Sequence, residues 1–352
     1  MLMSFPAGLC PTVEVGGYMS GWGYGLLFRK YGLATDNVID AQLVDAKRRL
    51  FDRKSMGEDL FWAIRGGSGG SFGIVVAWKL QLVPVPKTVT LVNRILEQNA
   101  TKLVRKWQTI AHKLPIEFYS GITFAPIDID GHQGTKKTIV ASFHALFLGT
   151  IDEVLLIMQE KFPELGLLRE DCTEMSWLQS ILYMGLLPND RSYQNPLLSP
   201  SFKAKSDSGG CIGRGVGKTF GGRSTLCHHK FDCIRRNNGW NSIQCNRGGI
   251  LYKIVYSVGW AVEDNERWEW YVNWSRRLYS YMGPFVSKSP PRAYISYRNG
   301  ETSYEEARVW GIKYFMDNFD KLASVKTMFD PDNFFRHEQS ITTLSSPSNM
   351  EL

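Results

Sequence analysis

The chain has 352 residues, of which 43% are hydrophobic and 21% charged, so it is long enough for two domains and is neither disordered, collagen-like nor disulfide-dense. No stretch approaches the roughly 20 consecutive apolar residues of a membrane-spanning helix, and the first residues do not have the pattern of a signal peptide. The net charge is +7, but residues 206–248 alone supply +5 of it through seven Lys or Arg against two Asp, which disfavours nucleic-acid binding by the whole chain.

The first quarter of the chain contains two glycine-rich segments. Residues 8–25 hold six glycines among small and aromatic residues, a composition that favours turns over helices and strands, and residues 66–73 form the second segment. Backbone N–H groups that lack a neighbouring Cβ atom can approach phosphate groups closely, so the two segments predict a cradle for a dinucleotide pyrophosphate. Neither has the G-x-G-x-x-G spacing of a nicotinamide-binding βαβ unit, which argues against that class of site.

Between and after these segments the sequence predicts alternating strands and helices. Strand composition occurs at residues 38–46 and 72–83, a turn and the start of a strand at 47–54, and an amphipathic helix at 57–65. Two prolines end this part, and we place a domain boundary near Pro86. Beyond it the pattern predicts strands over 88–96, 137–147 and 252–260, and helices over 103–112, 152–162, 265–282 and 305–329.

Four separated motifs point to one protein family. They are Leu9-Cys-Pro-Thr-Val13 leading into Gly16-Gly17, Lys30-Tyr-Gly-Leu-Ala-Thr-Asp-Asn37, Gly57-Glu-Asp-Leu-Phe-Trp-Ala-Ile-Arg-Gly-Gly67, and Asp330-Pro-Asp-Asn-Phe-Phe-Arg-His-Glu-Gln-Ser-Ile341. In this order they resemble the plant berberine bridge enzyme-like FAD-linked oxidases. The resemblance covers roughly residues 5–205 and 249–341.

The resemblance implies an α+β fold of the vanillyl-alcohol oxidase type. Residues 1–86 would be the C-terminal part of a PCMH-type FAD-binding domain. Residues 87–293 would form a substrate domain with an antiparallel sheet backed by helices, and residues 294–341 a segment that returns to the FAD domain. Residues 342–352 would be a tail.

The same resemblance implies FAD as the cofactor, attached covalently through Cys10 to the C6 position of the flavin. Val13 matches the position that gates oxygen access. The family's second, histidyl link comes from an upstream motif to which none of the six histidines here belongs, so that link is not expected. No metal is expected. The further residues implied around the cofactor are Thr12, Gly16, Gly17, Ser20, Gly21, Gly23, Gly25, Asn37, Gly73, Ile74 and Asn333.

The resemblance also implies the reaction, which is oxidation of an alcohol, sugar or alkaloid-type substrate by hydride transfer to flavin N5. Tyr297 as phenolate would take the substrate hydroxyl proton, Lys253 would favour that phenolate, and Tyr24 would line the substrate face. Val255 stands where related sequences have Gln. The implied partners are a small-molecule substrate and molecular oxygen, without nucleic acid or membrane, and the protein is expected to be a monomer.

The chain departs from the family pattern in its first glycine-rich segment and at its start. Tyr18 and Trp22 replace a His and a Gly, and an indole at position 22 is expected to clash where the backbone should approach the cofactor. Full-length members also have roughly a domain of sequence before the Cys motif.

Two hypotheses therefore stay open, an FAD-dependent oxidase and an inactive product of a truncated, frameshifted gene that does not hold FAD. The family is typically secreted or vacuolar, and without a signal peptide the location of this chain is left open.

Residues 208–247 carry no likeness to the family. A cluster over 227–245, made of Cys227, His228, His229, Cys233 and Cys245, could suggest a zinc site in a basic nucleic-acid-binding module, but its spacing is not a standard one. One back-translation of residues 227–241, read one base later, encodes an apolar strand and then Gly-Gly-Ile-Met-Asp, which resembles the family at this place. We therefore expect residues 208–247 to be frameshifted and disordered.

Overall fold

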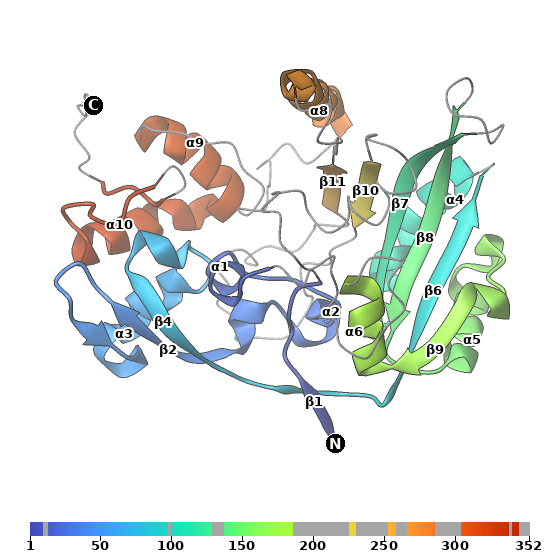
Figure 1. The fold of residues 1–352 in the computed structure, drawn as a ribbon, viewed down its shortest axis with the longest axis horizontal. Coiled ribbons are helices and arrows are strands. Elements are labelled where there is room, and N and C mark those ends of the chain that lie inside the picture. Colours follow the sequence, from blue (N-terminus) through green and yellow to red (C-terminus); the bar gives the residue numbers. More distant parts are fainter. Residues whose placement is uncertain are drawn as a thin grey trace.

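The computed structural model describes residues 1–9, 13–97, 100–128, 137–185, 225–229, 253–257, 266–285, 304–337 and 340–344. Two sheets, one of three strands and one of six, lie at opposite sides of the molecule, with helices α1 (Val15–Ser20) and α2 (Phe28–Tyr31) between them (Figure 1). The combination of helices with antiparallel sheets confirms the predicted α+β class. No helix in the described ranges is long and apolar enough to cross a membrane.

The three-stranded sheet and its helices are built from both ends of the chain. Strand β2 (Val38–Val44) pairs antiparallel with β3 (Leu50–Phe51) and β4 (Ile74–Leu80). Helix α3 (Arg53–Ile64) begins at Asp52, whose carboxylate accepts a hydrogen bond from the N–H of Ser55 at 2.8 Å. The C-terminal helices α9 (Tyr304–Phe315) and α10 (Phe319–Phe329) share one apolar core with this sheet and α3.

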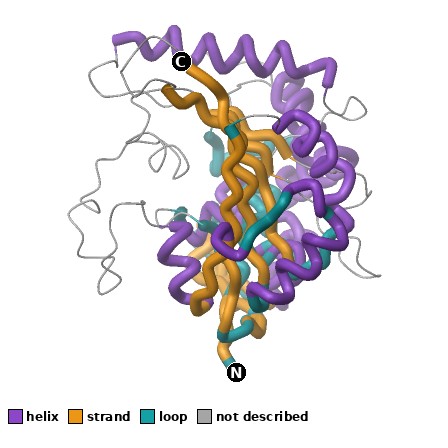
Figure 2. Tube along the Cα trace, turned by 90° about the vertical axis from the view of Figure 1, so that its right-hand side faces the viewer, coloured by secondary structure: helices purple, strands orange, loops and turns teal. Residues whose placement is uncertain are grey.

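The six-stranded sheet has the order β11-β10-β7-β8-β6-β9, and every neighbouring pair is antiparallel. Its strands are β11 (Lys253–Ser257), β10 (Thr225–His229), β7 (Phe118–Asp128), β8 (Lys137–Phe147), β6 (Thr88–Leu96) and β9 (Cys172–Ser176). Helices α4 (Ala100–Ile110) and α5 (Ile151–Lys161) lie along one face of this sheet (Figure 2). Trp107, Phe143, Val154 and Phe162 fill the core between those helices and the sheet. Helix α8 (Trp268–Met282) lies at the top of Figure 1.

A third apolar core lies on the six-stranded sheet. It contains residues of α2, of β5 (Val83–Val85) and of α6 (Trp177–Gly185), packed on the face of the six-stranded sheet that α4 and α5 leave free. Strand β1 (Leu2–Ser4) pairs antiparallel with β5. The buried guanidinium of Arg29 donates to the carbonyls of Phe118 at 2.7 Å and Leu114 at 2.8 Å, so α2 is fixed to the beginning of β7.

Most predicted elements are confirmed, and three need correction. Residues 15–20 of the first glycine-rich segment form a helix instead of turns, because its buried Met19 is anchored in the core. The predicted helix over 305–329 is two helices, since Met316 takes a φ of +53° between them. The predicted strand over 72–83 ends at Leu80, and Pro84 lies inside β5, a short strand of a two-stranded sheet.

The basic segment over 208–247 lies mostly outside the described residues. Five of its residues, Thr225–His229, form strand β10, which pairs with β7 on one side and β11 on the other. These five residues differ from the loop expected there. The frameshift of this segment and the domain boundaries remain predictions.

Candidate active site

The register of the six-stranded sheet shows which residues share a face with Lys253 and Val255. Directly paired residues in antiparallel strands lie on one face, and neighbouring residues along a strand lie on opposite faces. The row of positions through Lys253 continues across the sheet through His229, Gly121, His144 and Asn93. The row through Val255 continues through Cys227, Thr123, Ser142 and Ile95. This face is the one opposite to helices α4 and α5.

Along β6, β7 and β8 this face has an apolar half and a polar half. The apolar half consists of Val89, Leu91, Tyr119 and Leu146, all buried in the third core. The polar half consists of Asn93, Ile95, Gly121, Thr123, Ser142 and His144. Among these six, the side chains of Asn93 and Ile95 are exposed, those of Thr123, Ser142 and His144 are half-buried, and Gly121 is buried. The polar half is therefore the part of this face, next to the position of Lys253, that lies outside the third apolar core.

The side chains of the polar half offer hydrogen bonds without negative charge. Thr123 and Ser142 carry hydroxyls, Asn93 carries an amide, and no Asp or Glu stands at the described positions of the two rows. His144 is half-buried, and loss of water around its ring lowers its pKa to about 4. At neutral pH its imidazole is uncharged, with one nitrogen as donor and the other as acceptor.

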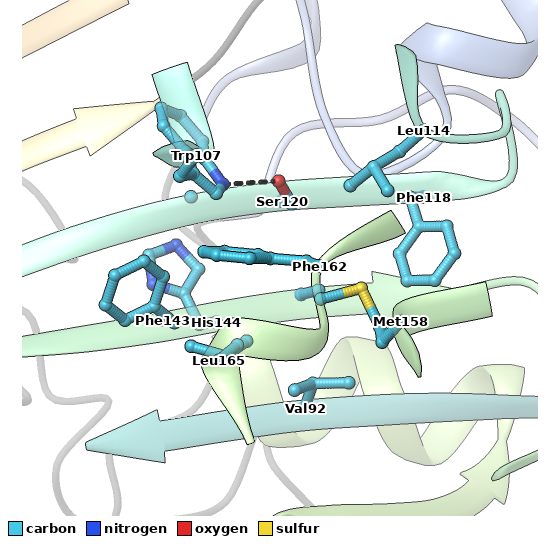
Figure 3. A pocket seen from close by; sticks show the side chains of 12 residues that line it. Val92, Trp107, Leu114, Phe118, Ser120, Phe143, His144, Met158, Phe162 and Leu165 are labelled. Carbon is cyan, nitrogen blue, oxygen red and sulfur yellow. Dashed lines mark hydrogen bonds between the residues drawn. The ribbon is translucent and has the colours of Figure 1, made fainter. Parts of the chain in front are cut away.

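The other face of the sheet contains a cavity of about 20 Å³ under α4 and α5, shown in Figure 3. Apolar side chains line it, among them Val92, Trp107, Phe118, Phe143, Met158 and Phe162. Trp107 Nε1 donates to Ser120 Oγ at 3.1 Å, and Gly121 and His144 also border the cavity. A volume of this size holds about one water molecule. The cavity is too small for a substrate and is part of the core.

The two glycine-rich segments pack directly on one another. The N–H of Ser68 donates to the carbonyl of Ser20 at 2.9 Å, and a Cβ atom on Gly69 would lie 2.5 Å from Ser20 Oγ. Gly66, with a φ of +107°, is in contact with the indole of Trp22, which a Cβ atom at position 66 would strike. Where the segments meet, no gap separates Ser20 from Gly69 or Trp22 from Gly66.

Trp22 takes part in the core of the three-stranded sheet. Its side chain is 2% exposed, its φ is +77°, and its ring meets that of Phe315 edge to face with 6.0 Å between centroids. A bulky residue at positive φ is strained. The burial of the indole offsets that strain, so the chain itself accommodates Trp22 without a clash. The ring of Tyr18 covers Gly23, and its hydroxyl donates to the carbonyl of Pro6 at 3.1 Å.

A buried ion pair attaches the C-terminal motif to the second glycine-rich segment. Lys326 Nζ donates to Asp330 Oδ2 at 2.5 Å, to the carbonyl of Ser71 at 2.6 Å and to that of Phe335 at 2.9 Å. Burial would raise the pKa of Asp330, but Lys326 and two backbone N–H groups lower it, so the carboxylate is charged. The N–H of Ile341 donates to Ser71 Oγ at 2.9 Å. The turn that contains Asn333 is thus held against residues 66–73.

Asn333 is the residue of this turn that offers a free acceptor. It has a φ of +48°, and its buried Oδ1 has no hydrogen-bond partner among the described residues. A buried amide oxygen without a partner is unfavourable by about 1–3 kcal/mol, which a ligand N–H or O–H would relieve.

At the other end of the chain, Val13 is 42% exposed, and Gly16 and Gly17 are exposed with open space around their Cα atoms. Among the described residues, Asn333 Oδ1 lacks a partner, Val13, Gly16 and Gly17 are exposed, and the two glycine-rich segments are in direct contact with each other.

The remaining residues expected at the site serve the packing of the chain or lie elsewhere. Cys10, Thr12 and Tyr297 are outside the described residues. The amide of Asn37 donates to the carbonyls of Tyr31 at 3.0 Å and Leu33 at 2.9 Å. The other expected site residues that the structure describes are Ser20, Gly21, Gly23 and Gly25 in the first glycine-rich segment, and Gly73 and Ile74. Gly73 packs against Leu43, and Ile74 lies on the exposed side of β4.

Tyr24 is half-buried and lies at the edge of the third core. Its ring meets that of Phe28 edge to face at 6.5 Å between centroids. The prediction from sequence did not single out the polar residues Asn93, Thr123, Ser142 and His144. The alternation along residues 88–96 and 137–147 was visible, but the face that these residues occupy depends on pairing with β7, the strand of Thr123, which the sequence pattern did not reveal.

Comparisons with known proteins agree with this architecture. A family model described as "Berberine and berberine like" matches residues 293–342. The chain is 44% identical over 363 residues to berberine bridge enzyme-like 24 of Arabidopsis thaliana, covering 96% of this chain and 66% of that protein. It is 42% identical over 380 residues to tetrahydroberberine oxidase of Berberis wilsoniae, covering 97% and 69%.

Solved structures give the same result. Berberine bridge enzyme-like 28 from Arabidopsis thaliana superposes with a TM-score of 0.80 at 35% identity, covering 97% of this chain and 74% of that chain. Phl p 4, described as a grass pollen allergen with glucose dehydrogenase activity, superposes with a TM-score of 0.81 at 37% identity, covering 97% and 72%. The chain spans about two thirds of the length of the curated relatives it matches. With this identity and coverage, the chain belongs to the berberine bridge enzyme-like family of plant FAD-linked oxidoreductases.

Proposed function

We propose that this chain is an FAD-dependent oxidase that removes a hydride from an alcohol, sugar or alkaloid-type small molecule. The observation that carries the proposal is the polar half of the sheet face, whose positions lie in register with Lys253 and outside the third apolar core of the described residues. Relatives at 42–44% identity include one named tetrahydroberberine oxidase.

We assign the flavin to the neighbourhood of Cys10, with the cysteine thiolate as its point of attachment. The exposed Val13 follows three residues later, where its small side chain would control the approach of oxygen. The unpartnered Oδ1 of Asn333 would accept a hydrogen bond from the cofactor. When bound, the flavin supplies an acceptor for two electrons.

Tyr297 and Lys253 would carry the proton chemistry. A tyrosine hydroxyl normally titrates near pH 10, so at neutral pH it acts as a base only where a cation favours its phenolate. Lys253 would be that cation, and Tyr297 would take the proton from the substrate hydroxyl. Tyr24 would close the substrate site at the edge of the third core.

The alternative is a chain that does not hold FAD. It is favoured by the direct contact between the two glycine-rich segments, where Trp22 lies on Gly66 and Ser20 on Gly69. In that case the family sequence persists without its cofactor, and Trp22→Gly is the substitution that would reopen the space.

Absorbance of the purified chain before and after acid precipitation separates the two proposals. If Cys10 holds the flavin, yellow colour stays with the precipitated protein and is lost from it in Cys10→Ala. Cys172→Ala is the matched control, because Cys172 is a buried free cysteine whose thiol pKa is raised to about 11 by burial. A colourless wild-type chain would overturn the oxidase proposal, and flavin uptake by Trp22→Gly would then identify the indole as the cause.

A further inference from the structure

We propose that Lys326 and Asp330 are positioning residues for the cofactor. Their buried ion pair holds the turn that carries Asn333, so that the side-chain oxygen of Asn333 is kept available to an N–H or O–H group of FAD. The inference rests on the proposed function, because it concerns the same cofactor. It gives a role to two buried charged groups that the proposed hydride and proton transfer do not use.

The ion pair lies where the chain leaves helix α10, and its hydrogen bonds are complete. Lys326 is 0% exposed and Asp330 2%, so both charges are removed from water. Lys326 Nζ donates to Asp330 Oδ2 and to the carbonyls of Ser71 and Phe335. An ammonium has three N–H donors, and these three acceptors use all of them. Lys326 therefore has no donor left for a ligand and can act on one only through the residues that it holds.

The carboxylate of Asp330 fixes the turn that follows the helix. Its Oδ1 accepts the N–H of Phe334 at 2.9 Å, and its Oδ2 accepts that of Phe335 at 2.9 Å. The backbone carbonyl of Asp330 accepts the N–H of Asn333 at 3.0 Å. Three successive backbone N–H groups are thus bonded to one residue, which fixes the conformation of residues 333–335.

Asn333 has an uncommon backbone conformation within this turn and an unpaired polar atom. Its φ of +48° lies in the left-handed region, which residues other than Gly, Asn and Asp avoid. Its Oδ1 is buried and has no hydrogen-bond partner among the described residues, which is unfavourable for the free chain. Such a combination of backbone strain and an unpaired acceptor is expected where a ligand supplies the missing donor.

The same ion pair sets the position of the turn relative to the second glycine-rich segment. Lys326 Nζ reaches the carbonyl of Ser71 at 2.6 Å, and the N–H of Ile341 donates to the hydroxyl of Ser71 at 2.9 Å. Without the ammonium, one of these two ties is lost and the Asp330 carboxylate has no cation. The turn is then free to shift, and the oxygen of Asn333 shifts with it.

Reversible binding of FAD tests the inference without turnover. All variants are made in the Cys10→Ala background, where the proposed covalent bond cannot form, and equilibrium dialysis against FAD gives the Kd. We expect Asn333→Gly, which tolerates the positive φ and lacks the acceptor, to weaken binding about tenfold, the effect of roughly one hydrogen bond. Lys326→Met is expected to weaken binding by about the same factor.

A double variant separates positioning from general destabilisation. If Lys326 acts through Asn333, then Lys326→Met raises the Kd less than about twofold in the Asn333→Gly background. A loss that is as large in this background as in its absence would overturn the inference, because the two residues would then act independently.

Two further variants control for folding and for charge. Lys326→Met leaves a buried carboxylate without its cation, so circular dichroism and the urea midpoint show whether it folds. If it does not fold, Asp330→Asn, which removes the charge and keeps an acceptor oxygen, takes its place. Lys321→Met is the matched control on α10, because Lys321 pairs with Asp59 at 3.1 Å on the surface and should keep the Kd within about twofold.

An unchanged Kd in a folded Lys326→Met or Asp330→Asn variant would overturn the inference, and so would an equal loss in Lys321→Met. A Cys10→Ala chain that does not bind FAD at all would overturn it as well, since Asn333 would then give no measurable reversible binding. The colour of the precipitated wild-type chain is a separate measurement, so failure of the proposed function and failure of this inference are distinguishable.

Discussion

One face of the six-stranded sheet carries two surfaces of opposite character on the same strands. On β6, Leu91 is buried and Ile95, four residues later, is 53% exposed. On β8, Leu146 is buried in the third core, whereas His144, two residues earlier, is half-buried and lies outside that core. The apolar half joins the sheet to α2 and α6, and the polar half is the part to which we assign a ligand. The same strands thus carry a surface that packs and a surface that is less buried, and the side chains determine the difference.

The largest loss of stability is expected when a buried side chain of the apolar half is shortened. Leu146→Ala should lower the free energy of unfolding by about 2–5 kcal/mol, because Leu146 is fully buried and pairs directly with Leu91 and Tyr119. The urea midpoint measures this. Ser142→Ala, on the same strand and face, is the matched control and should lose less than about 1 kcal/mol. Equal losses in the two variants would mean that the two halves do not differ as described.

A smaller loss of stability is expected when the pH is lowered, because His144 of the polar half is then protonated. The pKa of His144 is about 4 in the folded chain and near 6.5 when unfolded, so the unfolded state binds more protons between these values. Stability from this residue is complete above about pH 6.5 and is lost as the pH falls towards 4, by at most about 3 kcal/mol.

Urea titrations at pH 7 and pH 4 check this loss. His144→Gln should lose less stability than the wild type over the same interval, and the difference between the two isolates the histidine from the carboxylates that titrate nearby. Parallel losses in both proteins would show that His144 is not desolvated.

The smallest change in the free energy of unfolding is expected from a substitution at the exposed end of β6. Ile95→Ser should change the free energy of unfolding by less than about 0.5 kcal/mol, because the side chain is already largely in water. Leu91→Ser, on the same strand and face, should lose about 3 kcal/mol or more, since it removes a buried apolar side chain and buries a hydroxyl. Thermal midpoints of the two variants give the comparison, and a destabilised Ile95→Ser would indicate that the polar half is covered.

Much of the fold could be predicted from residue patterns. Strands over 88–96 and 137–147 have the predicted bounds, and the helices over 103–112 and 152–162 begin only one to three residues earlier than predicted. These segments have strong periodicity, and a capping box at Thr150 marks the start of α5. Strand β7 escaped prediction because Gly121 and Pro126 interrupt its pattern, although the pairing with β8 tolerates both.

Less of the candidate site than of the fold could be predicted from the sequence. The motif around Cys10 and the strand with Lys253 could be found from residues alone, and so could the turn at Asn333. The contact of Trp22 with Gly66 and the ion pair of Lys326 with Asp330 join segments whose relation has no local signal. The same holds for His144, whose place in the row with Lys253 requires the pairing of four strands.

The sequence by itself determined the family and the alternation of most strands, and it supplied the residues that we propose to hold a flavin or move a proton. These depend on local residue order, and neighbouring residues fix them. The tertiary structure decided that the two glycine-rich segments fill each other's space and that one sheet face divides into an apolar and a polar half. The physical reason is that strand register and core packing join residues far apart in the chain, so the surroundings of a side chain are set only when the sheets and cores assemble.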